Sequence, residues 1–170
     1  MSVHHHKRVE TPVNCVIITI SDTRTAETDK SGNLMAAILA EADHSVKEHV
    51  IVPDESNAIR SMVLEASKQE DTDIILTNGG TGIANRDITI ETIQPMLDKE
   101  MTGFGEIFRM LSYQEDIGSA VILSRAIAGV IGGKAIFAMP GSSGAVKLAM
   151  NKLIVPELAH VTNELKKDAK

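Results

Sequence analysis

One stretch of the sequence decides the fold: Asp73-Ile74-Ile75-Leu76-Thr77-Asn78-Gly79-Gly80-Thr81-Gly82. Its first half, residues 73–77, is a short apolar run of the kind that forms a strand buried on both faces. Its second half is rich in glycine, which adopts positive φ easily and lets a ligand approach the main chain. The stretch therefore predicts a buried strand that runs into a ligand-binding loop.

A second stretch has the same design nearer the end of the chain. Residues 135–139 form an apolar run, and Pro140-Gly141-Ser142-Ser143-Gly144-Ala145 follows it, just before a segment with helical periodicity. The N-terminus of a helix carries a partial positive charge that favours phosphate. The alternative is that both loops are ordinary tight turns, which are also rich in glycine and proline. Because two such loops each follow a buried strand, we favour an anion-binding site.

Strands and helices alternate on both sides of these stretches. Apolar runs predict strands over residues 13–20, 45–52, 73–77, 126–131 and 134–138. Helical spacing of apolar residues predicts helices over residues 34–42, 59–66, 89–98, 105–114 and 146–165, the last kinked or divided at Pro156. This order is typical of βαβ units, so we expect an α/β fold with a mostly parallel sheet and helices on both faces. Gly132-Gly133 between the last two strands predicts a tight turn and an antiparallel edge.

The bulk composition limits what the chain can bind. With 170 residues we expect a single domain over residues 13–170, preceded by a flexible segment over residues 1–12. A net charge of -6 and an aromatic content of 2% disfavour nucleic acid and anionic membranes, so a small molecule is the expected ligand. Residues 1–12 lack the apolar stretch of a secretory signal, which favours a cytoplasmic location.

Two features near the N-terminus are interpreted as structural. His4-His5-His6 could bind a metal, but a histidine triplet on a chain terminus is more often disordered or added for purification. Cys15, the single cysteine, lies inside the first predicted strand and has no base beside it in sequence. We therefore expect a buried structural thiol.

Carboxylates and arginines follow several of the predicted strands. Asp22 follows the first strand, Asp54 the second, and Arg86-Asp87 the first glycine-rich loop. Asp22 and Asp54 could instead be turn or N-cap residues. Asp87 offers a ligand for Mg²⁺ and Arg86 a guanidinium for phosphate. Ser124-Arg125 offers a further anion contact, although an arginine on the surface is the commoner case.

Taken together, these motifs resemble the MoaB/Mog family of molybdenum cofactor biosynthesis proteins, which is related to the gephyrin G domain. The resemblance covers residues 13–165 in the same order, and the stretch 103–112 looks most like the MoaB branch. It rests on the following segments: Thr19-Ile20-Ser21-Asp22-Thr23, Pro53-Asp54-Glu55, the glycine-rich loop 77–82, Arg86-Asp87, Leu123-Ser124-Arg125 and Met139-Pro140-Gly141. One departure is Ile90, where Mog-like members have proline.

The resemblance implies a three-layer α/β/α fold of the MogA type and a reaction. The family's reaction is the Mg-ATP-dependent adenylylation of molybdopterin, which releases pyrophosphate. Asp54 and Asp87 would then be catalytic and place Mg²⁺. The residues implied to bind molybdopterin and ATP are Ser21, Asp22, Thr77, Gly79, Gly80, Thr81, Gly82, Arg86, Ser124, Arg125, Pro140, Gly141, Ser142, Ser143, Gly144 and Ala145.

Other roles stay open at this stage. Some members of the MoaB branch lack the Arg-Asp element, so a non-catalytic molybdopterin-binding or carrier protein is the main alternative; Arg86-Asp87 favours the enzyme. The link to gephyrin suggests an assembly role, for which Phe104, Phe108 and Met110 could form a surface unless they belong to the core. The resemblance also implies a homo-oligomer, a trimer or a hexamer, with transient contacts to other enzymes of the pathway.

Overall fold

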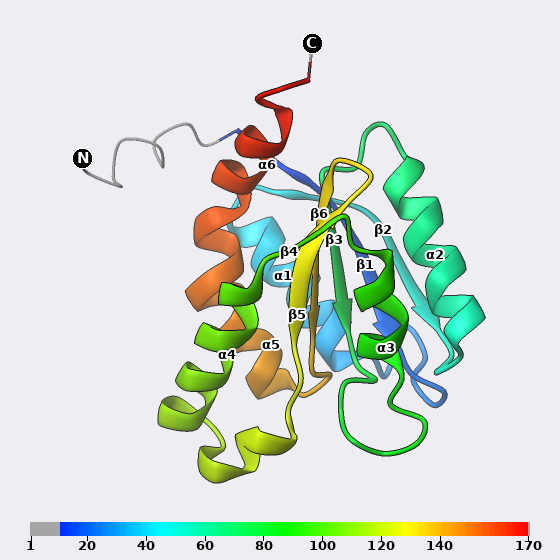
Figure 1. Cartoon of the computed structure of the whole chain (residues 1–170), viewed down its shortest axis with the longest axis vertical. Helices are drawn as coiled ribbons and strands as arrows, with labels where there is room; N and C mark the ends of the chain where they lie inside the picture. Colours follow the sequence, from blue (N-terminus) through cyan, green and yellow to red (C-terminus); the bar gives the residue numbers. More distant parts are fainter. Residues whose placement is uncertain (1–10, 170) are drawn as a thin grey trace.

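The protein is described by a computed structural model that covers residues 11–169, so the histidine triplet and most of the predicted N-terminal segment lie outside the described residues. A six-stranded sheet with the order β2-β1-β3-β6-β5-β4 forms its centre (Figure 1). The parallel strands are β1 (Asn14–Ile20), β2 (Ser45–Val52), β3 (Ile74–Asn78) and β6 (Lys134–Met139). The strands β5 (Ile127–Ile131) and β4 (Lys99–Glu100) form the predicted antiparallel edge.

Helices cover both faces of this sheet, as Figure 1 shows. The α-helices are α1 (Lys30–Glu41), α2 (Ser56–Lys68), α3 (Thr89–Ile93), α4 (Thr102–Glu115), α5 (Ser143–Ala149) and α6 (Leu158–Lys166). Shorter helical turns are η2 (Gln94–Met96), η3 (Gly118–Leu123), η4 (Met150–Ile154, a π-helix) and η5 (Val155–Glu157).

The strand β1 explains why there are three layers. Cys15 and Ile17 point into a core shared with α1, α4, α5 and α6, whereas Val16, Ile18 and Ile20 point into a second core shared with α2 and α3. Successive residues of a strand face opposite sides, and here both sides are buried. The predicted α/β fold with a mostly parallel sheet and an antiparallel edge is confirmed.

Several elements differ from the expected ones for local reasons. The helix predicted over residues 89–98 ends as α3 at Ile93 and continues only as the short turn η2, which contains Pro95. The last helix is divided, since η4 and η5 separate α5 from α6 and Pro156 lies in η5. The short strand β4 and the turn η3 were not predicted, because neither has a periodic pattern of its own.

The structure also resolves the two open interpretations of apolar residues. Cys15 is fully buried, and burial raises the pKa of its thiol to about 12, so the predicted structural thiol is confirmed. Phe108 is fully buried, and Phe104 stacks on it at a centroid distance of 6.2 Å. Met110, in contrast, is exposed on α4. Among residues 11–169, no helix is both long and apolar enough to cross a membrane.

Candidate active site

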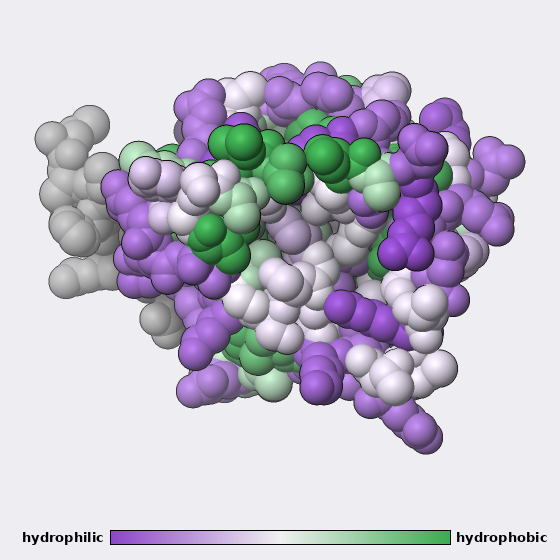
Figure 2. Space-filling view, turned by 90° about the horizontal axis from the view of Figure 1, so that it is seen from below, coloured by the Kyte–Doolittle hydropathy of each residue, from purple (hydrophilic) through white to green (hydrophobic). Residues whose placement is uncertain are grey.

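The chain order places a pocket at the carboxyl ends of the parallel strands. From β1 the chain crosses to β2 on one side and then returns to β3 on the other side of β1. Ligands of open α/β sheets bind beyond such a point, because the loops there diverge. A pocket of about 380 Å³ lies at this end, lined by residues that follow β1, β2, β3 and β6. Figure 2 views the molecule from this end and shows surface of mixed polarity.

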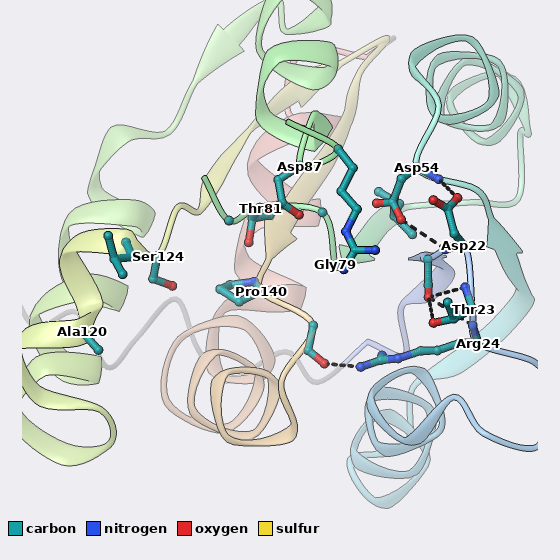
Figure 3. A pocket seen from close by; sticks show the side chains of 17 residues that line it. Asp22, Thr23, Arg24, Asp54, Gly79, Thr81, Asp87, Ala120, Ser124 and Pro140 are labelled. Atoms are coloured by element: carbon teal, nitrogen blue, oxygen red, sulfur yellow. Dashed lines mark hydrogen bonds between the residues drawn. The ribbon is translucent and has the colours of Figure 1, made fainter. Parts of the chain in front are cut away.

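Most of the predicted site residues meet in this pocket (Figure 3). The predicted residues that line it are Ser21, Asp22, Asp54, Gly79, Gly80, Thr81, Gly82, Arg86, Asp87, Ser124, Pro140 and Gly141. They come from loops that are far apart in sequence, so the fold brings together the carboxylates, one guanidinium and both glycine-rich loops.

The two glycine-rich loops touch each other through Gly79 and Gly141. Gly79 N donates to the carbonyl oxygen of Met139 at 3.0 Å, and a Cβ atom added to Gly141 would lie 3.2 Å from Gly79 Cα. Gly79 has φ +100° and Gly80 has φ +67°, the left-handed conformations that glycine adopts without strain. A Cβ atom on Gly79 would collide with the carbonyl oxygen of Ile20. A side chain at Gly79 would therefore displace the end of β1, and one at Gly141 would press against the first glycine-rich loop.

Asp22 and Asp54 form a reciprocal pair on one wall. Asp22 N donates to Asp54 Oδ2 at 3.1 Å, and Asp54 N donates to Asp22 Oδ1 at 2.9 Å. Burial and then the neighbouring Asp22 raise the pKa of the Asp54 carboxyl, although the Asp22 N–H and Arg86 act in the opposite direction. The pair thus concentrates negative charge, which a cation would relieve.

Asp87 lies on the loop after β3, at the pocket edge of α3. Its Oδ2 atom accepts a hydrogen bond from Ala84 N at 3.0 Å, and the carboxylate lies beside Gly82. Thr89 Oγ1 donates to the carbonyl oxygen of Gly79 at 2.9 Å and so ties this loop to the start of α3. Loop and helix together fix the Asp87 carboxylate toward the glycine-rich loop.

Mg²⁺ fits the oxygen ligands that this pocket offers. Mg²⁺ is usually held by one or two carboxylates together with substrate phosphates and water. Asp54 and Asp87 both line the pocket. Within the part of the chain that the structure describes, no group of three or more His, Cys, Asp or Glu side chains could hold a metal alone. Two carboxylates in one pocket match the share that a protein usually contributes to a Mg²⁺ site.

The structure keeps six predicted residues away from the pocket lining. Thr77 is fully buried inside β3. Ser142 caps α5, since its Oγ accepts from Ala145 N at 3.2 Å, and the Asp116 carboxylate lies against Gly144. At this helix start the N–H group of Ala145 is thus capped by the protein itself. The residues concerned are Thr77, Arg125, Ser142, Ser143, Gly144 and Ala145.

Arg125 does not line the pocket but donates hydrogen bonds to the backbone of the first glycine-rich loop. Its Nε donates to the carbonyl oxygens of Thr81 and Gly82 at 3.1 Å each. Its Nη2 donates to the carbonyl oxygens of Gly82 at 2.7 Å and Asp87 at 3.1 Å, and its Nη1 pairs with Glu91. The guanidinium is committed to protein acceptors, so its position indicates a role in shaping the pocket loop.

A buried polar network behind the pocket was missed by the sequence analysis. The fully buried Asp29 carboxylate accepts from Thr19 Oγ1 at 2.6 Å and Gly32 N at 2.9 Å, and His49 Nε2 lies 2.9 Å away. Burial opposes ionisation, but these hydrogen bonds keep the pKa of Asp29 below its ordinary value. Asp29 is also the N-cap of α1.

Five further lining residues were not predicted. The pocket is also lined by Ile20, Thr23, Arg24, Ala120 and Leu123. Ile20 and Thr23 belong to the quoted segment 19–23, and Arg24 is its direct neighbour, so a wider reading of that segment could have included them. Leu123 belongs to the quoted segment Leu123-Ser124-Arg125, whereas Ala120 comes from the part of η3 for which no pattern was found.

The fold and this pocket define an open α/β protein whose candidate ligand site lies at the carboxyl ends of its parallel strands. Residues 16–160 match the family model described as "Probable molybdopterin binding domain". Molybdenum cofactor biosynthesis protein B of Bacillus subtilis (strain 168) is 62% identical over 170 residues, covering 99% of each chain. The chain belongs to the MoaB family of molybdenum cofactor biosynthesis proteins.

Solved structures agree with this assignment. A crystal structure of a molybdenum cofactor biosynthesis protein B is 59% identical with a TM-score of 0.92, covering 94% of this chain and 99% of that chain. The tungsten cofactor synthesizing protein MoaB from Pyrococcus furiosus is 38% identical with a TM-score of 0.81, covering 92% and 98%. Both structures cover more than nine tenths of this chain.

Proposed function

We propose that the protein catalyses the Mg-ATP-dependent adenylylation of molybdopterin. An oxygen of the terminal phosphate of molybdopterin attacks the α-phosphorus of ATP. The bond from that phosphorus to the β-phosphate oxygen breaks, which gives adenylyl-molybdopterin and pyrophosphate. The observation that carries the proposal is the convergence of Asp54, Asp87 and both glycine-rich loops on one pocket in a member of this family.

The residues of the pocket suit a reaction that needs alignment more than proton transfer. A phosphate monoester has a second pKa of about 6, so at neutral pH the nucleophile is already mostly anionic. The protein must instead hold two anions that repel each other and neutralise the charge that develops. The backbone N–H groups of residues 80–82 and the Arg86 guanidinium can hold phosphate oxygens, whereas Gly79 N already donates to the carbonyl oxygen of Met139. Asp54 and Asp87 would hold magnesium, which would supply neutralisation of phosphate charge. ATP as a substrate agrees with a cytoplasmic location.

The direct test is pyrophosphate release by the purified protein with molybdopterin, ATP and Mg²⁺. Asp87→Asn keeps the shape of the side chain but removes its charge, so turnover should fall by about 100-fold or more. Affinity for molybdopterin should stay within about threefold, because the substitution does not close the pocket. Glu106→Gln, an exposed carboxylate of α4 outside this pocket, is the matched control. Binding of molybdopterin by the wild-type protein without pyrophosphate release would favour the carrier alternative.

We also propose that the protein forms a homo-oligomer, a trimer or a hexamer. The support is an apolar stripe on the outer side of α4, where Ile107, Met110 and Tyr113 are exposed although Phe108 on the opposite side is fully buried. Helices that are apolar on more than one side are usually covered. The same surface could serve transient contacts with other enzymes of molybdenum cofactor synthesis.

A further inference from the structure

Arg24 is a cationic side chain of the pocket to which the sequence analysis gave no role. It follows β1 and reaches the second glycine-rich loop near Pro140 (Figure 3). Its Nη1 atom is 3.4 Å from Asp29 Oδ1, and its Nη2 donates to the carbonyl oxygen of Gly141 at 2.8 Å. The side chain is 30% exposed and lines the pocket. The guanidinium is thus fixed at the wall formed by Pro140 and Gly141.

Neither of these two partners depends on Arg24. Asp29 already accepts hydrogen bonds from Thr19 Oγ1 and Gly32 N and contacts His49 Nε2. The carbonyl oxygen of Gly141 also accepts from Ser31 Oγ. Arg24 is therefore not needed as a hydrogen-bond donor for the Asp29 carboxylate or for the carbonyl oxygen of Gly141. The fixed position therefore points to a partner that is not part of the protein.

The charge of the pocket indicates what that partner is. Asp22, Asp54 and Asp87 line it, and among residues 11–169 the cationic side chains of the lining are Arg24 and Arg86. A guanidinium has five N–H donors. One donor contacts Asp29 and one Gly141, so others can face the pocket. Phosphate oxygens are the ligands that a fixed guanidinium binds best.

We propose that Arg24 is an anion-binding residue that donates hydrogen bonds to a phosphate group of a substrate at the Pro140–Gly141 wall. Asp29 holds the guanidinium in place before the substrate arrives, which lowers the entropy lost on binding. The nature of the substrate rests on the proposed function, whereas the affinity for a phosphate group does not. The phosphate belongs either to molybdopterin or to the nucleotide, and these two sources can be separated by experiment.

The test is equilibrium binding without turnover. Titration calorimetry would measure the Kd of Mg-ATP alone, of pyrophosphate alone and of molybdopterin alone for the wild type, Arg24→Gln and Arg24→Lys. Because a hydrogen bond to a charged group is worth about 1.5–3 kcal/mol, Arg24→Gln should raise at least one Kd by roughly 10- to 100-fold. Arg24→Lys should recover part of the loss. The matched control is Arg60→Gln, which removes the same charge from the exposed side of α2 and should leave every Kd unchanged.

The probes separate the two sources of phosphate. A loss of affinity confined to Mg-ATP and pyrophosphate assigns Arg24 to the nucleotide, and a loss confined to molybdopterin assigns it to the pterin phosphate.

Thermal unfolding distinguishes a binding role of Arg24 from a structural one. Arg24→Gln should unfold within a few degrees of the wild type, because Asp29 and the carbonyl oxygen of Gly141 keep their other hydrogen-bond donors.

Three results would overturn the proposal. They are unchanged Kd values of Arg24→Gln for all three probes, no binding of any probe by the wild type, and a loss of affinity equal in Arg24→Gln and Arg60→Gln. A different result would show that the proposed adenylylation is wrong. If the wild type released no pyrophosphate while Arg24→Gln still lost affinity for a phosphate probe, adenylylation would be wrong and the role of Arg24 would stand.

Discussion

The Nη2 atom of Arg125 donates a hydrogen bond to the carbonyl oxygen of Gly82 at 2.7 Å, across 43 positions of the sequence. The same guanidinium also holds the carbonyl oxygens of Thr81 and Asp87. One side chain from the segment before β5 thus fixes both the glycine-rich loop and the backbone of the residue proposed to be catalytic. The pocket depends on this contact although Arg125 does not line it.

Replacing Arg125 should therefore loosen the loop without unfolding the protein. Loss of these hydrogen bonds should reduce the local opening free energy by about 2 kcal/mol, which corresponds to roughly 30-fold faster amide exchange over residues 79–88. Exchange followed by mass spectrometry for Arg125→Gln would measure this, with Arg60→Gln as the control. Turnover should fall in parallel. Unchanged exchange over residues 79–88 would show that the loop keeps its shape without Arg125.

Arg125 also shows how far the sequence predicts the site. The position of both glycine-rich loops at the ends of strands followed from local patterns, since a buried strand and its loop are adjacent in sequence. Most of the predicted residues do line the pocket, but the exceptions could not be identified from local patterns. Ser142 looked like a phosphate ligand but caps its own helix, and the reach of Arg24 to Gly141 depends on where β1 and β6 lie in the sheet. Such contacts are set by the tertiary fold.

At the edge of the sheet, too, some elements depend on tertiary contacts and could not be predicted from local sequence. The two-residue strand β4 has no pattern of its own and exists because it pairs with β5. The turn η3 is apolar, with Ile122 83% exposed, so burial does not explain its sequence. In contrast, the long strand β1 could be predicted because its buried positions on both faces are apolar apart from Thr19.

Gly79 should tolerate no side chain. An alanine there would have to adopt φ +100°, and its Cβ would meet the carbonyl oxygen of Ile20. We expect Gly79→Ala to reduce the free energy of unfolding by about 3 kcal/mol or more, as measured by denaturant titration. Gly103→Ala is the matched control: no atom lies within 4 Å of its added Cβ, and it lies in the first turn of α4. That change should have no effect or stabilise the protein by up to about 1 kcal/mol. Equal effects at the two positions would contradict this account of the loop.

Asp54 should set the acid limb of the pH profile. If the ionised carboxylate is required, its raised pKa means that activity is lost at a higher pH than for an ordinary aspartate. Asp22→Asn removes a neighbouring negative charge, so the pKa of Asp54 should fall and the acid limb should move to lower pH. Pyrophosphate release measured as a function of pH checks this direction. A limb that moves to higher pH, or does not move, would exclude Asp54 as the titrating group.

The raised pKa of Asp54 also affects how the free energy of unfolding depends on pH. The folded pKa of Asp54 lies above its unfolded value, so ionising this carboxyl costs stability at pH values above the folded pKa, and the cost disappears below the unfolded value of about 3.9. Asp54→Asn should therefore abolish turnover yet leave the protein as stable as the wild type, or more stable, at pH 7. A large loss of stability in this variant would mean that the Asp22–Asp54 pair supports the fold and not the reaction.

The apolar stripe of α4 gives the test of assembly. Ile107, Met110 and Tyr113 lie three residues apart and are exposed in the single chain, so burying them against other copies is the simplest way to remove them from water. Met110→Glu would place an unpaired charge in that interface and should weaken self-association by about 100-fold or more. Light scattering should give a trimer or hexamer for the wild type and a smaller species for Met110→Glu. Ile83→Glu, at an exposed position on the loop after β3 and not on α4, should keep the wild-type mass. A wild-type monomer would leave the stripe free for a different partner, whereas dissociation by Ile83→Glu alone would move the interface to the rim of the pocket.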